Sequence, residues 1–346
     1  MNTDWLRTLR AAIDQHTPVT GPGNETLAQA TGMLQRLLVG AADGLPRPAP
    51  PASVRPRPSP AEAVPQGARF LAGSYRCEAG SRPYKLFTPS GYQGQPVALV
   101  VMLHGCTQSP DDFAAGTRMN EFAERETFLV LYPEQTQAAN PNRCWNWFNA
   151  GDQQRGRGEP AVIAGMTCQI MHDHAVDPAR VFVAGLSAGG AAAAVLGATY
   201  PDIFAAIGVH SGLACGAASD MASAFAAMRG GKDGINVRAG TAVPTIIFHG
   251  DRDTTVHPAN GDAVAAALGA ATTTEPPRQP GGTGHGYSRV FHTDAAGRVV
   301  GEQWTIHGAG HAWSGGSPAG SFTDPAGPDA TAEMLRFLHG NPRRKM

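Results

Sequence analysis

Residues 183–190 read Val-Ala-Gly-Leu-Ser-Ala-Gly-Gly, and this octapeptide decides the fold. The apolar run directly before it is typical of a short buried strand, and the alanine-rich residues 191–198 favour a helix. A strand that turns directly into a helix needs glycine where the two backbones approach, and the pattern supplies Gly185 and Gly189. The sequence therefore predicts a sharp turn that exposes Ser187 in front of a helix N-terminus, which is typical of a nucleophilic serine.

A nucleophilic serine needs a base, and the base needs an acid that orients it. In a chain of this pattern the acid follows the serine, and here the apolar run 243–248 leads into His-Gly-Asp-Arg-Asp. Ligand sites of open α/β sheets gather at the carboxyl ends of the strands. We choose Asp253 as the acid because it has more freedom to reach back across the sheet. Asp251 is expected to cap the helix that begins near Ala259.

The base is predicted to be His311, on the glycine-flanked loop that follows the strand-like run 299–306. It comes last in the chain order of serine, acid and histidine. His307 is the nearest rival, but it falls at the end of the strand and not on the loop. The order or the loop context is missing for His210, His257 and His285.

Two backbone N–H groups are predicted to bind the oxyanion that forms when such a serine attacks a carbonyl. The apolar run 97–103 leads into His104-Gly105, and a glycine turn there would aim the N–H of Cys106 at the oxyanion. The N–H of Ala188, directly after the serine, supplies the second donor. The alternative for the His-Gly pair is an ordinary turn at a strand end.

These residues lie within longer blocks, and the blocks resemble the esterase family that includes poly(3-hydroxybutyrate) depolymerases, within the α/β-hydrolase superfamily. The resemblance extends over roughly residues 68–340 and places the nucleophile, acid and base of the family on Ser187, Asp253 and His311. Its oxyanion donors fall on Cys106 and Ala188. The blocks read LHGCTQSPDDF (103–113), NRCWNWF (142–148), VDPARVFVAGLSAGGAAAAVLGATYPDIFAAIGVHSG (176–212), VPTIIFHGDRDTTVHPANG (243–261) and HGAGHAWSGG (307–316).

The resemblance implies a serine carboxylic-ester hydrolase that works through an acyl-enzyme on polyhydroxyalkanoate polyester, its oligomers and short-chain acyl esters. A feruloyl or acetyl-xylan esterase acting on plant polysaccharide is the alternative, and a peptidase on the same scaffold is another. A further alternative is a non-enzymatic protein associated with polymer granules. Since no Cys/His spacing is typical of a zinc site, neither a metal nor another cofactor is expected.

Two further pairs of residues stand out inside the family-like blocks. We predict that Cys106 and Cys144 form a disulfide between the two loops that frame the site, with two buried free thiols as the alternative. Trp145 and Trp313 stand beside the predicted catalytic loops, so they are candidate contacts for a polyester chain or a sugar ring, with core packing as the alternative. Outside these blocks, Cys168 is expected to be a core thiol on the apolar face of a helix.

The order of the elements predicts an α/β-hydrolase fold, a mostly parallel sheet with helices on both faces. The first two strands should form an antiparallel edge. Strands are predicted at 70–76, 84–88, 97–103, 128–133, 180–184, 205–209, 243–248, 288–293 and 299–306, and helices at 116–126, 161–174, 188–200, 259–269 and 328–339.

The chain of 346 residues divides into an N-terminal helical segment (1–43), a proline-rich linker (44–67) and a catalytic domain (68–346). A net charge of −1 gives no reason to expect nucleic acid as a partner, and no apolar run approaches the length of a membrane span. Charged residues interrupt the apolar run that an N-terminal signal peptide needs, which favours the cytoplasm, while the resemblance allows secretion. The oligomeric state is left open.

Overall fold

The structure, a computed structural model, describes residues 64–230, 243–280 and 284–343. The predicted helical segment 1–43 and residues 44–63 of the predicted linker lie outside the described residues. The predicted division of the chain into domains therefore stays a prediction.

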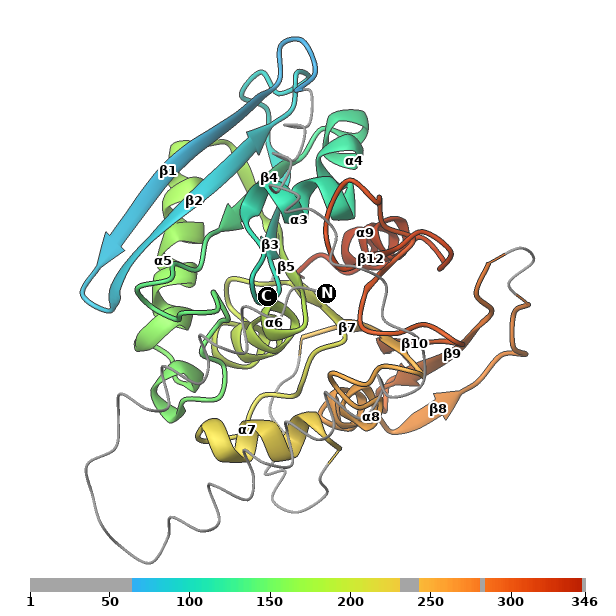
Figure 1. The fold of residues 1–346 in the computed structure, drawn as a ribbon. Helices are drawn as coiled ribbons and strands as arrows, with labels where there is room; N and C mark the ends of the chain where they lie inside the picture. The colour runs from blue at the N-terminus through green and yellow to red at the C-terminus, as the bar shows by residue number, and fades with distance from the viewer. Residues whose placement is uncertain (1–63, 231–242, 281–283, 344–346) are drawn as a thin grey trace, which may run out of the picture. The chain divides into compact units, whose positions relative to one another are not determined.

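Ten of the described strands form one sheet in the order β1-β2-β4-β3-β5-β6-β7-β10-β9-β8 (Figure 1). The central strands, from β4 to β10 in that order, run parallel to one another. Antiparallel strands flank them on both sides, so the predictions of a mostly parallel sheet and an antiparallel edge are confirmed. The strands span Arg69–Cys77 (β1), Gly80–Thr88 (β2), Val97–Leu103 (β3), Leu129–Pro133 (β4), Val176–Leu186 (β5), Ala206–His210 (β6), Thr245–Gly250 (β7), Thr272–Thr274 (β8), Tyr287–Thr293 (β9) and Val299–Ile306 (β10).

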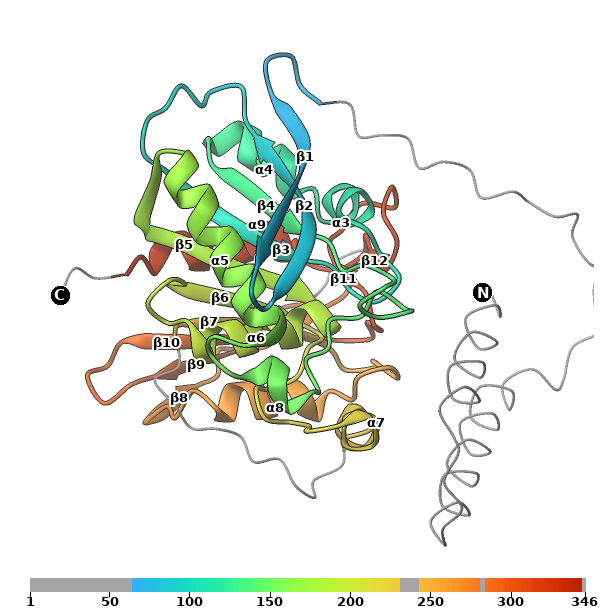
Figure 2. The same ribbon diagram turned by 90° about the vertical axis from the view of Figure 1, so that its left-hand side faces the viewer.

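Strand β3 shows why the sheet has a hydrophobic core on each face. All of its residues are buried, and successive side chains of a strand point to opposite faces. Leu99 and Val101 pack in one cluster with residues of helices α5 (Gly158–Asp173), α6 (Ala188–Thr199), α7 (Met221–Met228) and α8 (Ala259–Ala266). Val100 and Met102 pack in a second cluster with residues of α3 (Pro110–Thr117), α4 (Met119–Glu126) and α9 (Ala330–Gly340). Figure 2 looks onto the face that α5 and α6 cover. A strand that is apolar on both sides fits a parallel sheet covered on both faces.

The helices differ from the prediction mainly before β4. The predicted single helix 116–126 is wrong, because α3 and α4 meet at Arg118, whose φ of 57° ends α3. Helix α3 begins earlier because Ser109 caps it and Pro110 occupies its first turn. Helix α7 was not predicted. The helices span Pro110–Thr117 (α3), Met119–Glu126 (α4), Gly158–Asp173 (α5), Ala188–Thr199 (α6), Met221–Met228 (α7), Ala259–Ala266 (α8) and Ala330–Gly340 (α9), with a 3-10 turn at Ala150–Gln153 and a second small sheet of Trp313–Ser314 (β11) and Thr323–Asp324 (β12).

Candidate active site

The turn between β5 and α6 has the geometry that its glycines predict. Ser187 has φ 58° and ψ −120°, a conformation that costs a residue with a side chain about 1–3 kcal/mol. A Cβ atom on Gly189 would overlap the backbone of Leu103 and His104, so only glycine lets helix α6 start this close to β3. The N–H of Ser187 donates to the carbonyl of His210 at 2.9 Å, which ties the turn to β6.

Asp253 and His311 meet beyond the carboxyl ends of the parallel strands. Asp253 follows β7, and its Oδ2 accepts the Nδ1–H of His311 at 2.6 Å. Its other oxygen accepts the N–H groups of Thr255 at 2.9 Å and Val256 at 2.8 Å. The side chain of Asp253 has no exposed surface, so these hydrogen bonds hold it without competition from water.

Hydrogen bonds to Asp253 stabilise its ionised form. Burial alone would raise the pKa of Asp253, but hydrogen bonds from His249 and His311 outweigh it and hold the pKa well below its usual range. The Nε2 of His249 lies 3.5 Å from Oδ2 of Asp253. The ionised acid accepts a hydrogen bond from Nδ1–H of His311 and so keeps the proton on that nitrogen, which leaves Nε2 of the ring available as a base.

No hydrogen bond joins Ser187 to His311 among the described residues. Serine–histidine hydrogen bonds of this type often tighten only when substrate binds. The carbonyl of His210 accepts the N–H of Ser187, and the His210 ring lies within electrostatic range of His311 and Asp253.

The ring of His210 is a buried, uncharged part of the core next to the site. Its ring stacks against Phe248 at 5.7 Å and Trp313 at 5.1 Å between ring centroids. Nε2 accepts the N–H of Ser314 at 3.0 Å, so Nδ1 carries the proton and donates to Ser211 Oγ at 3.1 Å. Burial lowers the pKa of His210 to about 3. The ring is therefore a buried packing element and not an accessible base.

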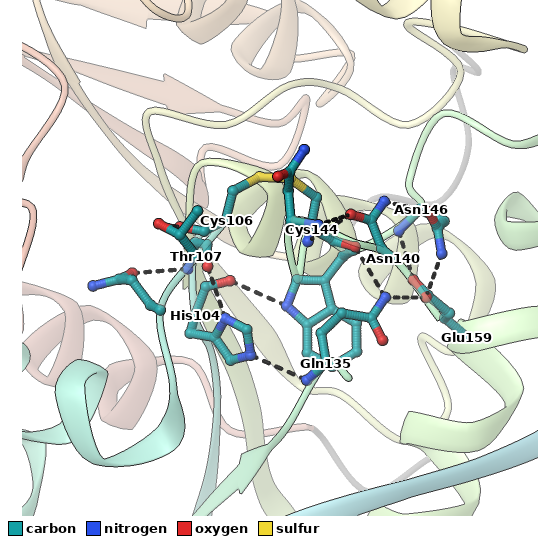
Figure 3. The surroundings of a disulfide bond; sticks show 12 residues. His104, Cys106, Thr107, Gln135, Asn140, Cys144, Asn146 and Glu159 are labelled. Atoms are coloured by element: carbon teal, nitrogen blue, oxygen red, sulfur yellow. Dashed lines mark hydrogen bonds between the residues drawn. A yellow bond between two sulfur atoms is a disulfide. The ribbon is translucent and has the colours of Figure 1, made fainter. Parts of the chain in front are cut away.

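The predicted disulfide between Cys106 and Cys144 is confirmed (Figure 3). It joins the loop after β3 to the loop that carries Trp145. Next to each cysteine a residue has left-handed backbone, Thr107 with φ 66° and Arg143 with φ 52°. The N–H of Thr107 also donates across the two loops to the carbonyl of residue 142 at 2.7 Å. The two loops therefore behave as one structural unit.

Buried polar side chains hold the Cys144 loop from below. Glu159 accepts both the backbone N–H of Asn146 at 2.7 Å and its side-chain Nδ2 at 2.9 Å (Figure 3). The guanidinium of Arg82 lies 3.0 Å from the same carboxylate, and Gln135 donates to it as well. None of these residues was predicted, because their partners are far away in the sequence.

The turn after β3 is fixed so that the N–H of Cys106 stays available. The Gly105 N–H donates to Gln108 Oε1 at 2.9 Å, and Nε2 of the same glutamine donates to Asp112 at 2.9 Å. A Cβ on Gly105 would lie 3.6 Å from the Cβ of Ser187, which places this loop against the serine. In the part of the chain that the structure describes, the N–H groups of Cys106 and Ala188 donate to no acceptor.

Trp145 and Trp313 are not substrate contacts, and that prediction is wrong. Their exposed fractions are 0% and 1%. The indole of Trp145 donates to the carbonyl of His104 at 3.1 Å, and that of Trp313 donates to Thr331 Oγ1 at 3.0 Å. Both rings point inward from their loops, so the alternative of core packing is the correct one.

Two smaller predictions are also wrong. Cys168 is exposed, because the buried stripe of α5 runs through Val162, Ile163 and Met166 and leaves position 168 on the outer side. Asp251 does not cap a helix. Its two oxygens accept hydrogen bonds from His307 and Gly308, which directly follow β10.

Over the ranges that the structure covers, no group of three or more His, Cys, Asp or Glu side chains is arranged to hold a metal ion. No helix in those ranges combines the length and the apolar character that a membrane crossing requires.

We expect the free energy of unfolding to fall as the pH drops from 6.5 towards 4. Burial lowers the pKa of His104 to about 4 and that of His210 to about 3, below the 6.5 of an ordinary histidine. Between pH 6.5 and 4 these two histidines are protonated in the unfolded chain but stay neutral in the folded chain. Their contribution to the free energy of unfolding is therefore fully present above pH 6.5. Below it, each ring removes up to ~1.4 kcal/mol per pH unit. Urea unfolding at several pH values measures the slope, and a constant or rising free energy on acidification would contradict it.

Comparison with known proteins gives matches in sequence and in fold. Residues 82–271 match the family described as "Esterase PHB depolymerase". The chain is 35% identical over 238 residues to poly(3-hydroxyalkanoate) depolymerase C of Paucimonas lemoignei, covering 64% of this chain and 56% of that protein. It is 30% identical over 193 residues to acetylxylan esterase A of Talaromyces purpureogenus, covering 51% and 50%. The chain therefore spans about half the length of these relatives.

Among solved structures, an acetyl xylan esterase from Aspergillus awamori has the same fold. The TM-score is 0.55 at 20% identity, and the match covers 75% of this chain and 94% of that one. This confirms the predicted α/β-hydrolase fold. The family match takes in more than half of the 346 residues and includes both the serine turn and Asp253. The chain belongs to the PHB depolymerase family of esterases.

Proposed function

We propose that the chain is a serine carboxylic-ester hydrolase that cleaves polyhydroxyalkanoate polyester, its oligomers and short-chain acyl esters. The observation that carries the proposal is the buried hydrogen bond of 2.6 Å between Asp253 and His311. It lies at the edge of the sheet where the Ser187 turn also lies. An ionised acid bonded to Nδ1 of a histidine is the arrangement that makes a nearby serine nucleophilic.

The first step forms the acyl-enzyme. His311 Nε2 takes the proton of Ser187 as the hydroxyl oxygen attacks the ester carbonyl carbon. Asp253 keeps the imidazole in the required tautomer and stabilises the positive charge that develops on it. The N–H groups of Cys106 and Ala188 bind the oxyanion of the tetrahedral intermediate. The intermediate collapses with cleavage of the ester C–O bond, and the protonated His311 gives its proton to the leaving alcohol oxygen.

The second step releases the acid. A water molecule loses a proton to His311 and attacks the carbonyl carbon of the acyl-enzyme. The second tetrahedral intermediate uses the same two N–H donors. When it collapses, the bond to Ser187 breaks and the serine oxygen recovers its proton from His311. One ester and one water become one alcohol and one carboxylic acid, so the two steps balance without an oxidant or a reductant.

The polyester assignment rests on the relatives. The depolymerase of Paucimonas lemoignei has the higher identity, which supports a polyhydroxyalkanoate. The acetylxylan esterase of Talaromyces purpureogenus supports the alternative of an acetyl or feruloyl ester on plant polysaccharide. The hypothesis of a non-enzymatic granule protein gives no reason for a buried, ionised Asp253 paired with His311, so we prefer the enzyme.

The place where the protein works also stays a proposal. The disulfide of Cys106 and Cys144 supports an oxidising compartment, because thiols are kept reduced in the cytosol. We propose on that ground that the enzyme works outside the cytosol.

A substrate panel tests the proposed function. The full chain is assayed with p-nitrophenyl butyrate, hydroxybutyrate oligomers, poly(3-hydroxybutyrate) film, acetylated xylan, a feruloyl sugar and a peptide amide. We expect hydrolysis of the butyrate ester and the oligomers, and a single covalent adduct on Ser187 after treatment with an organophosphate. Higher kcat/KM for acetyl or feruloyl sugars would favour the polysaccharide alternative. Cleavage of the amide alone, or an adduct at another residue, would contradict the proposal.

A further inference from the structure

A second chain of Asp, His and Ser side chains lies beside the Asp253–His311 pair. Oδ2 of Asp251 accepts from Nδ1 of His307 at 2.9 Å, and Nε2 of His307 lies 2.9 Å from Ser288 Oγ. Because the carboxylate can only accept, Nδ1 carries the proton of that bond, and Nε2 faces the hydroxyl of Ser288. The three residues belong to neighbouring strands, since Asp251 follows β7, His307 follows β10 and Ser288 lies in β9.

The bonding pattern is that of a catalytic triad, but Ser288 lacks what would make it reactive. It stands inside β9, which continues to Thr293, so no helix begins behind it. Its backbone is not left-handed, in contrast to that of Ser187. A serine in a continuous strand has neither the exposed turn nor the helix N-terminus that supplies an oxyanion donor. The array is therefore better explained by what it holds in place.

Asp251 and Arg252 connect the loop that carries Asp253 to the loop that carries His311. Besides accepting from His307, Asp251 accepts the N–H of Gly308 at 2.7 Å. The backbone continues the join, because the Asp251 N–H donates to the carbonyl of residue 306 and the Arg252 N–H to that of Ala309, both at 3.0 Å. Burial alone would raise the pKa of Asp251, but its hydrogen bonds outweigh it and hold the pKa below the usual value. These hydrogen bonds join residues 251–252 to residues 306–309. They therefore lie directly before Asp253 on one loop and shortly before His311 on the other.

His307 makes hydrogen bonds through its backbone and through both nitrogens of its ring. Its backbone N–H donates to the carbonyl of Gly286 at 2.8 Å, and its carbonyl accepts from Nδ1 of His285 at 3.0 Å. Both ring nitrogens are engaged by Asp251 and Ser288. The side chains of His307 and Asp251 are 20% and 38% exposed, so as a surface pair they contribute little to overall stability. Their effect is therefore expected in the geometry of the loops.

We propose that Asp251, His307 and Ser288 are positioning residues that hold the His311 loop against the Asp253 loop in the register needed for proton transfer. The inference rests on the proposed function, because it assumes that His311 is the base. A displacement of about 1 Å in a reacting group costs on the order of 10²-fold in rate, which sets the size of effect that a loosened loop can produce.

Four variants of the full chain test this role with p-nitrophenyl butyrate as substrate. His307→Ala removes both ring contacts. His307→Asn places an amide N–H where Nδ1 was, so it restores the bond to Asp251 alone. Ser288→Ala removes only the outer bond. Asp294→Asn is the matched control, since Asp294 holds Arg298 in the turn at the opposite end of the β9–β10 hairpin.

We expect His307→Ala to lower kcat about 10–100-fold with KM within twofold, and His307→Asn to recover most of the loss. Ser288→Ala should lower kcat less, and Asp294→Asn should leave it unchanged. Unaltered kcat in His307→Ala, failure of the asparagine to rescue, or a loss that appears in KM alone would overturn the positioning role.

Measuring Ser187→Ala in the same assay separates the two proposals. If Ser187→Ala is inactive and His307→Ala is fully active, only the positioning role fails. If Ser187→Ala is as active as the unmodified chain, the proposed function fails, and the positioning role fails with it. Should the residual activity of Ser187→Ala disappear on adding Ser288→Ala, Ser288 is itself a nucleophile, which also overturns the positioning role.

Discussion

Ser187→Ala will lower kcat for p-nitrophenyl butyrate by a factor on the order of 10⁶, while the fold stays intact. The change removes the oxygen that we propose attacks the ester, but it keeps the Cβ and therefore the backbone of the turn. The Ser187 side chain caps nothing in α6, so its hydroxyl contributes little to stability. Because nucleophile and base act as one unit, the remaining activity should reflect only the oxyanion donors and substrate binding.

Initial rates and urea unfolding of the same samples measure both parts of this expectation. Ser74→Ala is a matched control, because Ser74 is exposed on the edge strand β1, far along the sheet order from the site. It should keep full activity and stability. Activity in Ser187→Ala within tenfold of the unmodified chain would rule out this serine as the nucleophile.

Asp253→Asn will lower kcat about 10⁴-fold. The amide has nearly the shape of the carboxylate and can still accept the N–H groups of Thr255 and Val256. It carries no charge, however, and an amide N–H facing Nδ1 of His311 would favour the tautomer in which Nε2 holds the proton. That tautomer cannot take the proton of Ser187, so the geometry survives while the base is lost.

Asp251→Asn is the matched comparison for Asp253→Asn. It makes the same chemical change on the same loop, at a carboxylate that bonds His307 and not His311. We expect a loss of no more than about 100-fold, as for a loosened loop. Comparing kcat/KM of the two variants under one set of conditions decides between them. The reverse ranking would assign the acid to Asp251 and the base to His307, the rival considered from the sequence.

The parts of the site that the sequence predicts correctly are those with a local steric cause. Gly185 and Gly189 are needed because two backbones nearly touch, and this need is visible in a short window around Ser187. The contact between Asp253 and His311 follows from chain order and from the rule that strand ends share one edge of the sheet. Their catalytic roles remain proposals that the variants above test.

The incorrect predictions concern the direction in which a side chain points. Trp145 and Trp313 lie beside the loops of the site, but proximity in sequence does not tell which side of a loop an indole occupies. Cys168 lies in a helix, and there the prediction chose the wrong face, because the buried stripe of α5 runs through Val162, Ile163 and Met166. The start of α3 can be predicted from the sequence, because Ser109 followed by Pro110 is a common N-terminus of a helix. The prediction of a helix at 116–126 did not use this signal.

Other contacts of the site have no local signal. Gln108 reaches Ser321, which is 213 positions away in the chain, and Asp251 reaches His307 across 56 positions. Both contacts exist only because distant loops gather at one edge of the sheet. The strand order β7-β10-β9 puts the end of β7 beside the end of β10, which brings Asp251 next to His307.

The covalent link between residues 106 and 144 has a practical consequence for anyone who prepares this enzyme. Expression in a reducing host, or dithiothreitol in a purification buffer, will yield batches in which a fraction of the molecules has lost the cross-link. Specific activities from such batches would average two populations that hold the proposed oxyanion donor, the N–H of Cys106, differently. A free-thiol titration therefore belongs beside the protein concentration in every kinetic comparison between preparations.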